Sequence, residues 1–350
     1  MSDSANRSQR PRVLSGMRPT GKLHLGNYMG ALANWVKLQD SGPYECYFFI
    51  ADWHALTTDY ADPSQITPNT IEVMLDYLAA GLDPAKSVLF LQSRVPQHSE
   101  LFLDLAMISP LGWLERVPSY KEMQENLTNR DLTTYGFLGY PVLMASDILL
   151  YQPDFVPVGQ DQQAHVELTR ELARRFNSFY KLDGREVPPE PKALLTPSPK
   201  LPGTDGRKMS KSYGNTILLS DPEAEVRQKL KTMVTDPARV RRTDPGDPDK
   251  CPVGDLHKLF STPETMAKVY EGCRSAGIGC IECKGWAADS LMKVLGPIQE
   301  RRAGLSEAKA IEILEDGSRK AAARAEQTMV EVREAMQMRL TTVSGARCKD

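Results

Sequence analysis

Short apolar runs alternate with segments of helical periodicity through the first half of the chain, and this alternation restricts the fold more than any other feature. The apolar runs cover Arg12–Ser15, Glu45–Ile50, Ser87–Leu91 and Phe155–Val158. Between them, apolar residues recur with helical spacing over Asn27–Leu38, Thr70–Ala80 and Leu143–Tyr151. Strands that alternate with helices predict an α/β fold, a parallel Rossmann-type sheet built from βαβ units. Ligands of such sheets bind beyond the carboxyl ends of the strands.

The second half of the chain has a different pattern. The segment Val187–Gly206 is rich in Pro and Gly, and we expect no regular element there. After Asn215 the pattern is mostly helical, with a helix-start signal at Asp221–Glu223 and a long final helix over Ser306–Met338. We therefore predict a disordered tail over 1–12, a Rossmann-type domain over 13–215, a helical domain over 216–340 and a flexible tail over 341–350.

Charge and hydropathy restrict the partners. The 350 residues carry a formal net charge of −2, which argues weakly against nucleic-acid binding by the whole surface. The stretch Arg207–Arg242 is different, because nine Lys or Arg residues stand there against four acids, so a polyanion can bind locally. No apolar run approaches the ~18 residues of a membrane helix, and the first dozen residues lack the apolar core of a signal peptide. We expect a cytoplasmic protein without membrane or DNA partners.

A glycine-rich turn follows the first predicted strand. In Pro19–Gly30 (PTGKLHLGNYMG), Gly21 and Gly26 flank His24 just before a helix. Glycine lets the backbone approach a phosphate, and a helix N-terminus offers free N–H groups. Taken alone, the motif is equally typical of a turn with a surface histidine.

A second motif, KMSKS, lies about 180 residues further on, after the Pro/Gly segment. Its lysines, Lys208 and Lys211, can close over a triphosphate, although a lysine pair by itself usually marks a solvated surface. HLGN and KMSKS together resemble the paired signature of class I aminoacyl-tRNA synthetases. The resemblance assigns catalysis to His24, Lys208 and Lys211.

Over nearly its whole length the sequence resembles the tryptophanyl-tRNA synthetases. The matching segments are LSGMRPTGKLHLGNYMGAL, FFIADWHALTT, YPVLMASDILLY, VPVGQDQQAHVELTRELARRFN and GRKMSKSYGN. The resemblance implies that L-tryptophan is activated with ATP and Mg²⁺, that it is transferred to the 3′-terminal ribose of tRNA(Trp), and that the chain is a homodimer. One alternative is a tyrosyl-tRNA synthetase, which shares the fold. A nucleotidyltransferase and a non-catalytic sensor of tryptophan or tRNA are less favoured alternatives.

One acid supports tryptophan as the substrate. Indole presents a single N–H donor and no acceptor, and Asp147 is the only acid of the apolar helix around it. By resemblance, Asp147 accepts the indole N–H, and the tryptophan site also includes Leu14, His54, Tyr140, Met144, Val156, Val158 and Gln162. His54 is equally compatible with a core histidine.

ATP contacts also follow from the resemblance. They are assigned to Arg18, Pro19, Thr20, Gly26, Asn27, Gly159, Gln160, Asp161, Leu201, Lys208, Met209, Ser210, Lys211 and Ser212. Arg18 stands where many relatives have Gln.

Four of the six cysteines lie within 33 residues, at Cys251, Cys273, Cys280 and Cys283. Four-cysteine zinc sites usually use two CxxC pairs, and only one is present. A [4Fe–4S] cluster also takes four thiolates and accepts looser spacing. A subset of bacterial tryptophanyl-tRNA synthetases carries such a cluster with nearly this pattern, in the helical anticodon-binding domain. We therefore expect a cluster, with zinc or unligated thiols as the alternatives.

Overall fold

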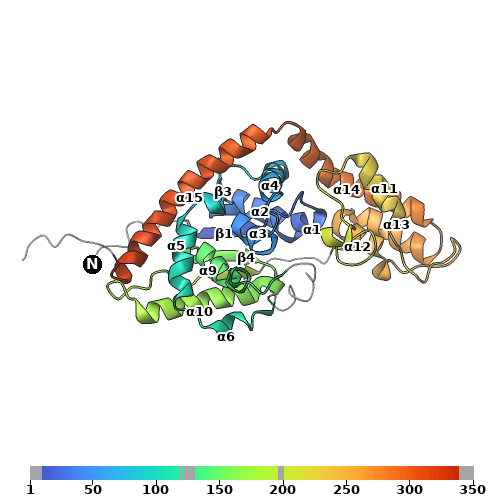
Figure 1. Cartoon of the computed structure of the whole chain (residues 1–350). Coiled ribbons are helices and arrows are strands. Elements are labelled where there is room, and N and C mark those ends of the chain that lie inside the picture. Colours follow the sequence, from blue (N-terminus) through green and yellow to red (C-terminus); the bar gives the residue numbers. More distant parts are fainter. Residues whose placement is uncertain (1–9, 119, 121–130, 196–200, 339–350) are drawn as a thin grey trace, which may run out of the picture.

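A computed structural model of the protein describes residues 10–118, 120, 131–195 and 201–338 (Figure 1). Most of the two predicted tails, and the side chain of Asp161, lie outside the described residues.

A five-stranded sheet confirms the predicted α/β fold. Its strands are β1 (Arg12–Met17), β2 (Glu45–Ile50), β3 (Ser87–Leu91), β4 (Phe155–Val158) and β5 (Lys192–Leu195), in the order β3-β2-β1-β4-β5. Every pair is parallel. The apolar sequences of β1 and β2 follow from their position, because central strands of a parallel sheet are covered on both faces. Val13 and Phe48, for example, are fully buried.

The prediction that Val187–Gly206 contains no regular element is wrong for β5. Its four residues pair with β4, from Phe155 beside Lys192 to Val158 beside Leu195. Lys192 and Leu195 are exposed, so β5 lacks the apolar run that marks a central strand. It forms because β4 offers an open edge, and the strand propensity of its own residues gives no indication of such a partner.

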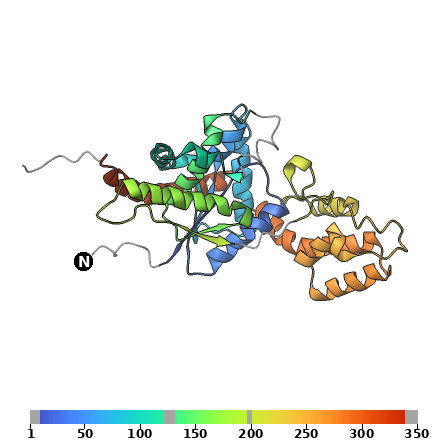
Figure 2. The same cartoon turned by 90° about the horizontal axis from the view of Figure 1, so that it is seen from below.

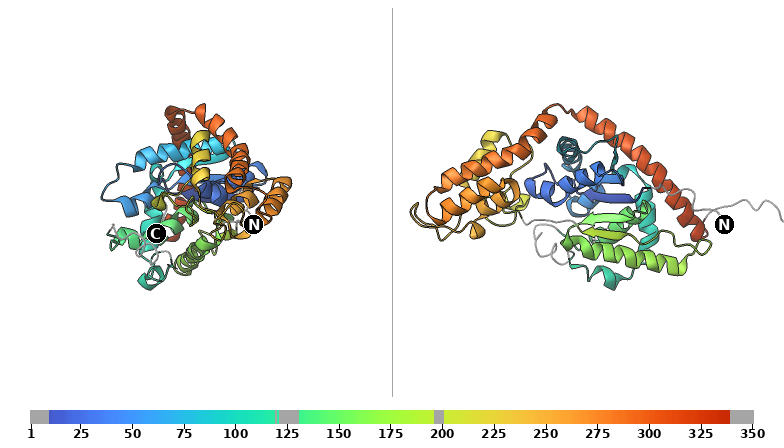
Figure 3. Two further views of the ribbon diagram at one scale, coloured as in Figure 1. Left: turned by 90° about the vertical axis from the view of Figure 1, so that its right-hand side faces the viewer. Right: turned by 180° about the vertical axis from the view of Figure 1, so that it is seen from behind.

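Helices cover both faces of the sheet (Figures 1 and 3). In the part of the chain predicted as the catalytic domain (residues 13–215), called the catalytic half below, they are α1 (Leu25–Asn27), the π-helix η1 (Tyr28–Leu32), α2 (Ala33–Asp40), α3 (Asp52–Asp59), α4 (Ile66–Ala80), α5 (Gln97–Ala106), α6 (Leu111–Leu114), α8 (Tyr135–Leu138), α9 (Tyr140–Leu150) and α10 (Gln163–Phe179). The helix predicted over Asn27–Leu38 is thus divided into three parts. The helix predicted from Leu143 begins at Tyr140, with Pro141 in its first turn.

The C-terminal region is helical, as predicted. It contains α11 (Glu223–Thr232), α12 (Pro252–Phe260), α13 (Pro263–Arg274), α14 (Cys280–Ala303) and α15 (Glu307–Ala335). Helices α11 to α14 gather on one side of the sheet, whereas α15 runs back along the catalytic half (Figures 1 and 2). Among the described helices, none is long and apolar enough to cross a membrane.

Helix α15 covers the edge strand β3. A Cβ atom on Gly317 would lie 1.8 Å from the Leu89 carbonyl oxygen, so only glycine permits this approach. The neighbouring Ser318 hydroxyl accepts the Leu91 N–H at 3.2 Å. An edge strand exposes unpaired backbone groups, and α15 both shields this edge and satisfies one of its donors.

Candidate active site

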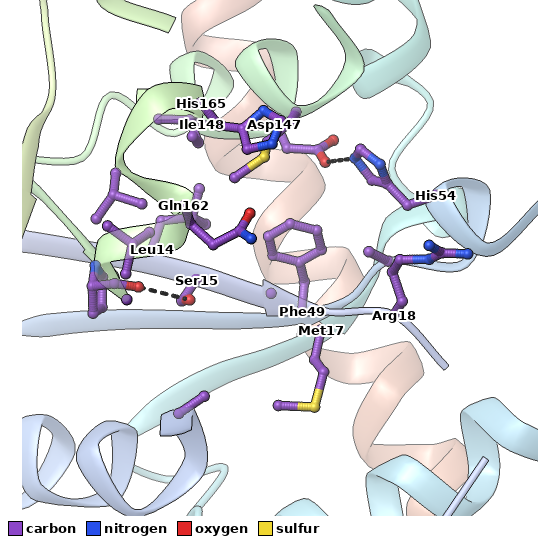
Figure 4. Close-up of a pocket in the computed structure, with 18 of the residues that line it drawn as sticks. Leu14, Ser15, Met17, Arg18, Phe49, His54, Asp147, Ile148, Gln162 and His165 are labelled. Atoms are coloured by element: carbon purple, nitrogen blue, oxygen red, sulfur yellow. Dashed lines mark hydrogen bonds and ion pairs between the residues drawn. The ribbon is translucent and has the colours of Figure 1, made fainter. Parts of the chain in front are cut away.

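A cavity of about 510 Å³ opens at the carboxyl ends of β1 and β4, where a parallel sheet binds its ligands. Side chains from β1, α3, α9 and the β4–α10 connection line it (Figure 4). The structure brings together there every residue that the resemblance assigns to tryptophan: Leu14, His54, Tyr140, Met144, Asp147, Val156, Val158 and Gln162. Phe49, Ile148 and His165 line the same cavity and were not predicted.

Asp147 is the buried acid of this cavity, with 1% of its surface exposed. Its Oδ1 accepts from Gln92 Nε2 and His98 Nδ1, each at 2.7 Å. Its Oδ2 lies 2.9 Å from His54 Nε2. Each carboxylate oxygen has two lone pairs, so with these donors from the described residues Oδ1 is saturated and Oδ2 keeps one acceptor position.

The charge of Asp147 is maintained by these neighbours. Burial alone would raise the pKa of its carboxyl group, but the hydrogen bonds from His54 and His98 lower the pKa below its usual value. His98 Nε2 lies 2.8 Å from the Tyr151 hydroxyl, so His98 can donate through Nδ1 while accepting from Tyr151. The result is a negative acceptor in an apolar cavity.

Gln92 and His98 were missed in the sequence analysis. Both are fully buried. Gln92 directly follows β3, and His98 lies in the first turn of α5. A polar residue at the carboxyl end of a buried strand was the available signal for Gln92. His98 carried no such signal, because only the fold brings α5 against α9.

His24 lies at the opposite end of the cleft, at the start of α1. Its ring Nδ1 accepts the Gly26 N–H at 3.0 Å, and the backbone N–H of His24 donates to Asn27 Oδ1 at 3.1 Å. Burial, and secondly the charge of Lys211, lower its pKa to about 4. The imidazole is therefore neutral at pH 7, and with Nδ1 accepting, its proton sits on Nε2.

Lys211 of KMSKS meets the glycine-rich turn. Its Nζ donates to the carbonyl oxygens of Gly21 at 2.8 Å and Thr20 at 3.1 Å. Burial lowers its pKa to about 8, although the charge of Asp76 acts in the opposite direction. The structure thus joins two motifs that are about 180 residues apart, whereas Lys208 is exposed and lines neither of the two cavities described.

A second cavity lies beside Lys211 and contains much of the predicted ATP set. Its lining includes Arg18, Pro19, Thr20, His24, Ser210, Lys211 and Ser212. Arg18 also lines the first cavity, together with Gly26, Asn27 and Gly159, so the two cavities adjoin. Arg18 Nη2 donates to Thr58 Oγ1 at 2.5 Å.

The other predicted ATP residues are placed less directly. Leu201 and Met209 are buried in the core, where the Leu201 carbonyl accepts the Met209 N–H at 2.9 Å. Gln160 is exposed and lines neither described cavity.

The four clustered cysteines lie at the ends of three helices. Cys251 directly precedes α12, Cys273 lies in the last turn of α13, and Cys280 and Cys283 lie in the first turn of α14. Burial, and then the charges of the other three thiols, raise the pKa of Cys283 to about 12. The thiols are therefore near neighbours, yet within the described residues no three or more His, Cys, Asp or Glu side chains form a group that could hold a metal ion.

Chemically, the cleft has two unlike ends. One is an apolar slot with a single ionised acceptor, which suits a flat ring bearing an N–H donor. The other offers a neutral histidine donor, a lysine and the N-terminus of a helix, which suit phosphate oxygens.

Comparison with known proteins agrees with this geometry. The chain belongs to the tRNA synthetases of class I for tryptophan and tyrosine, because the family model "tRNA synthetases class I (W and Y)" matches residues 6–296.

Its relatives place it in the tryptophan branch. It is 52% identical to the tryptophan–tRNA ligase of Thermotoga maritima, covering 93% of this chain and 99% of the relative. It is 47% identical to that of Ralstonia nicotianae, covering 93% and 98%. A crystal structure of the Campylobacter jejuni tryptophanyl-tRNA synthetase with ADP and tryptophan superposes with a TM-score of 0.82, at 33% identity over 93% of this chain and 99% of that one. The chain is a bacterial tryptophanyl-tRNA synthetase.

Proposed function

We propose that the described cleft activates L-tryptophan with ATP and then transfers the tryptophanyl group to the 3′-terminal ribose of tRNA(Trp). The observation that carries the proposal is the ionised Asp147, which has one open acceptor position inside an apolar slot. That position fits the indole N–H. The slot walls, Leu14, Met144, Val156 and Val158, would hold the ring, while Tyr140 and Gln162 would hold the amino-acid end.

The first step is an in-line attack of the tryptophan carboxylate on the α-phosphorus of ATP, with pyrophosphate leaving. The carboxylate is already a nucleophile, so no general base is needed. Catalysis then depends on orientation and on stabilising the charge that develops on the phosphate oxygens. His24 would donate from Nε2, and Mg²⁺ would arrive with ATP.

Lys211 would supply positive charge to the same oxygens. Its ammonium donates to two carbonyls of the glycine-rich turn, and phosphate oxygens would replace them when the nucleotide binds. The resemblance adds Lys208 to this group, and its exposed position means that it would reach the nucleotide from the loop surface.

Pyrophosphate exchange with each of the twenty amino acids tests the proposal. We expect ATP formation from labelled pyrophosphate with tryptophan and at least ~100-fold less with tyrosine, because buried polar groups that lose their partner discriminate strongly. Equal exchange with tyrosine would refute the assignment of this slot to tryptophan.

The tRNA would contact the helical region. The basic stretch Arg207–Arg242, which begins at KMSKS and continues into the helical region, offers the local positive charge that phosphate binding requires. An enzyme with this partner works where translation occurs, so we propose a cytoplasmic location.

We also propose that the four cysteines hold a [4Fe–4S] cluster. Four thiols are the ligand set of such a cluster, and these four lie at the ends of three helices, where the charges of the other three thiols act on Cys283. Cationic groups are available for its negative charge, since Arg239 lies 3.8 Å from the Cys273 sulfur. Bound there, a cluster would cross-link α12, α13 and α14.

Metal analysis of anaerobically purified protein tests this. We expect a brown protein with about four irons and four sulfides per chain, and loss of colour in Cys280→Ser and Cys283→Ser. Cys46→Ser, a buried cysteine of β2, is the control and should stay brown. Stoichiometric zinc without iron or sulfide, from an iron-replete host, would establish the zinc alternative instead.

Finally, we propose that the chain forms a homodimer through an apolar patch. The patch consists of Leu103, Met107, Leu111 and Phe179, each between 55% and 71% exposed. Arg175 joins its parts, because it donates to the Ile108 carbonyl at 2.6 Å and lies 5.1 Å over the Phe179 ring. A second copy is the expected occupant, since an exposed apolar patch of this kind marks a protein interface.

Analytical ultracentrifugation tests the dimer. The wild type should sediment as a dimer at micromolar concentration, and Met107→Glu combined with Leu111→Glu should give monomers. Val240→Glu is the control, because Val240 is 85% exposed and lies outside the patch. A monomeric wild type would refute the proposal.

A further inference from the structure

The last turns of α14 contact helix α4 and the chain segment that follows KMSKS. Gln299 Nε2 donates to the Asp221 carbonyl at 2.8 Å, and Arg301 Nε donates to the Ala79 carbonyl at 2.6 Å. Arg302 binds two acids of α4, Glu72 and Asp76. Helix α14 is thereby fixed against α4 and against the chain segment that follows KMSKS.

Asp76 connects this contact to the HLGN motif. Its side chain is fully buried, and its Oδ1 accepts from Arg302 Nη1. Its Oδ2 accepts the Leu23 N–H at 2.7 Å, and Leu23 directly precedes His24. Burial raises the pKa of Asp76 to about 6, while the charge of Arg302 favours the ionised form.

The other polar group of Leu23 is also held. Its carbonyl accepts the Leu219 N–H at 2.9 Å, and the Leu25 N–H donates to the Ile217 carbonyl at 3.0 Å. Gln299 supports the same segment, residues 217–221, by donating to the Leu219 and Asp221 carbonyls. The backbone on both sides of His24 therefore depends on partners that α14 contacts.

We infer that Asp76 is a positioning residue for His24, and that Arg302 of α14 holds it in place, so that the helical region fixes the geometry of the catalytic loop. The inference rests on the proposed role of His24 in adenylate formation. Helix α14 has 24 residues, about 36 Å at 1.5 Å per residue, and begins with Cys280 and Cys283. One helix therefore connects the cysteine group to the loop that carries His24.

A purely structural role for the pair predicts something different. If Arg302 only attaches α14 to α4, its loss lowers the melting temperature and the fraction of active molecules, but each active molecule turns over normally. If the pair positions His24, turnover per active site falls. Active-site titration by the burst of adenylate formation separates the two cases.

The variants are Arg302→Gln, Asp76→Asn and the double mutant. Each single variant should lower kcat per active site at least ~10-fold, since a small misplacement of a catalytic group is costly. The Kd of tryptophan should change less than ~2-fold, because the Asp147 end of the cleft does not contact this pair. The double mutant should be no slower than either single one, as expected of residues that act through one contact. Arg302→Lys should recover part of the rate.

Arg333→Gln is the matched control. Arg333 attaches α15 to α5 through Glu100, at 2.6 and 2.7 Å, and does not contact the catalytic loop. It should lower the melting temperature while kcat per active site stays unchanged. The inference is overturned if Arg302→Gln keeps kcat per active site within twofold of wild type while His24→Ala is slow. If the wild type fails to activate tryptophan, or His24→Ala is normal, the proposed function itself fails.

Discussion

Replacing Asp147 by Asn should lower kcat/KM for tryptophan, and the local hydrogen bonds allow the size of this effect to be estimated. Oδ1 accepts from both Gln92 and His98, so an asparagine would keep its oxygen there. Its amide nitrogen would then occupy the Oδ2 position and point a donor at the indole N–H. Two donors would face each other where the wild type has a charged acceptor.

The expected cost follows from that mismatch. A hydrogen bond to a charged group contributes about 1.5–3 kcal/mol, and each 1.36 kcal/mol is a factor of ten. We therefore expect kcat/KM for tryptophan in pyrophosphate exchange to fall by about 10- to 150-fold, nearer the upper limit because a donor replaces the acceptor.

A substrate without the N–H provides the sharper test. In 3-benzothienylalanine a sulfur atom replaces the indole N–H, so the wild type should use it poorly. Asp147→Asn should reduce kcat/KM for this analogue far less than for tryptophan. Asp104→Asn, the same change at a buried acid of α5 away from the cavity, controls for loss of stability. If Asp147→Asn reduces kcat/KM for tryptophan and for the analogue equally, Asp147 shapes the slot without recognising the N–H, and the reasoning is refuted.

Three further predictions concern catalysis and the fold. Lys211→Ala should slow adenylate formation in single-turnover kinetics at least ~100-fold while the tryptophan Kd stays nearly constant, because the proposed partner of Lys211 is the phosphate charge that develops in the transition state. Equal losses in rate and in tryptophan affinity would show that Lys211 mainly supports binding of the amino acid. The pKa of Lys211 is lowered to about 8, and only its protonated form would bind phosphate. We therefore expect kcat/KM for ATP to fall as pH rises through about 8. Lys211→Arg should abolish that decline between pH 7 and 9.5. Gly317→Ala should lower the melting temperature, because the new methyl group would lie 1.8 Å from the Leu89 carbonyl oxygen. Overpacking of this kind lowers the free energy of unfolding by about 1–3 kcal/mol. An unchanged melting temperature would show that α15 can shift freely.

Much of the catalytic half could be predicted because its signals are local. The strands β2, β3 and β4 have the bounds that their apolar runs indicate, and a helix begins within HLGN, where the glycine-rich turn led us to expect one. The resemblance also named residues that the structure brings together in one cavity, since these residues lie in the matching segments.

What could not be predicted depends on contacts between distant segments. Strand β5 forms only because β4 leaves an edge open, and α15 returns to cover β3 although its sequence shows only a periodic helix. The same limit applies to His98, whose role depends on α5 meeting α9. Sequence periodicity states which face of an element is apolar, but not which element will cover that face.

The two ends of the cleft are supported by different parts of the chain, and this division has a functional consequence. Asp147 is held by His54, Gln92 and His98, all from the catalytic half. The loop before His24 is held by Asp76, whose charge partner comes from α14. Since no residue belongs to both sets of contacts, substrate choice and activation rate should respond to different substitutions. On this reasoning, a change in the helical region alters the rate of tryptophan activation without relaxing the choice of amino acid. A synthetase needs this separation if tRNA that binds far from the cleft is to influence the reaction while the selection of tryptophan stays fixed.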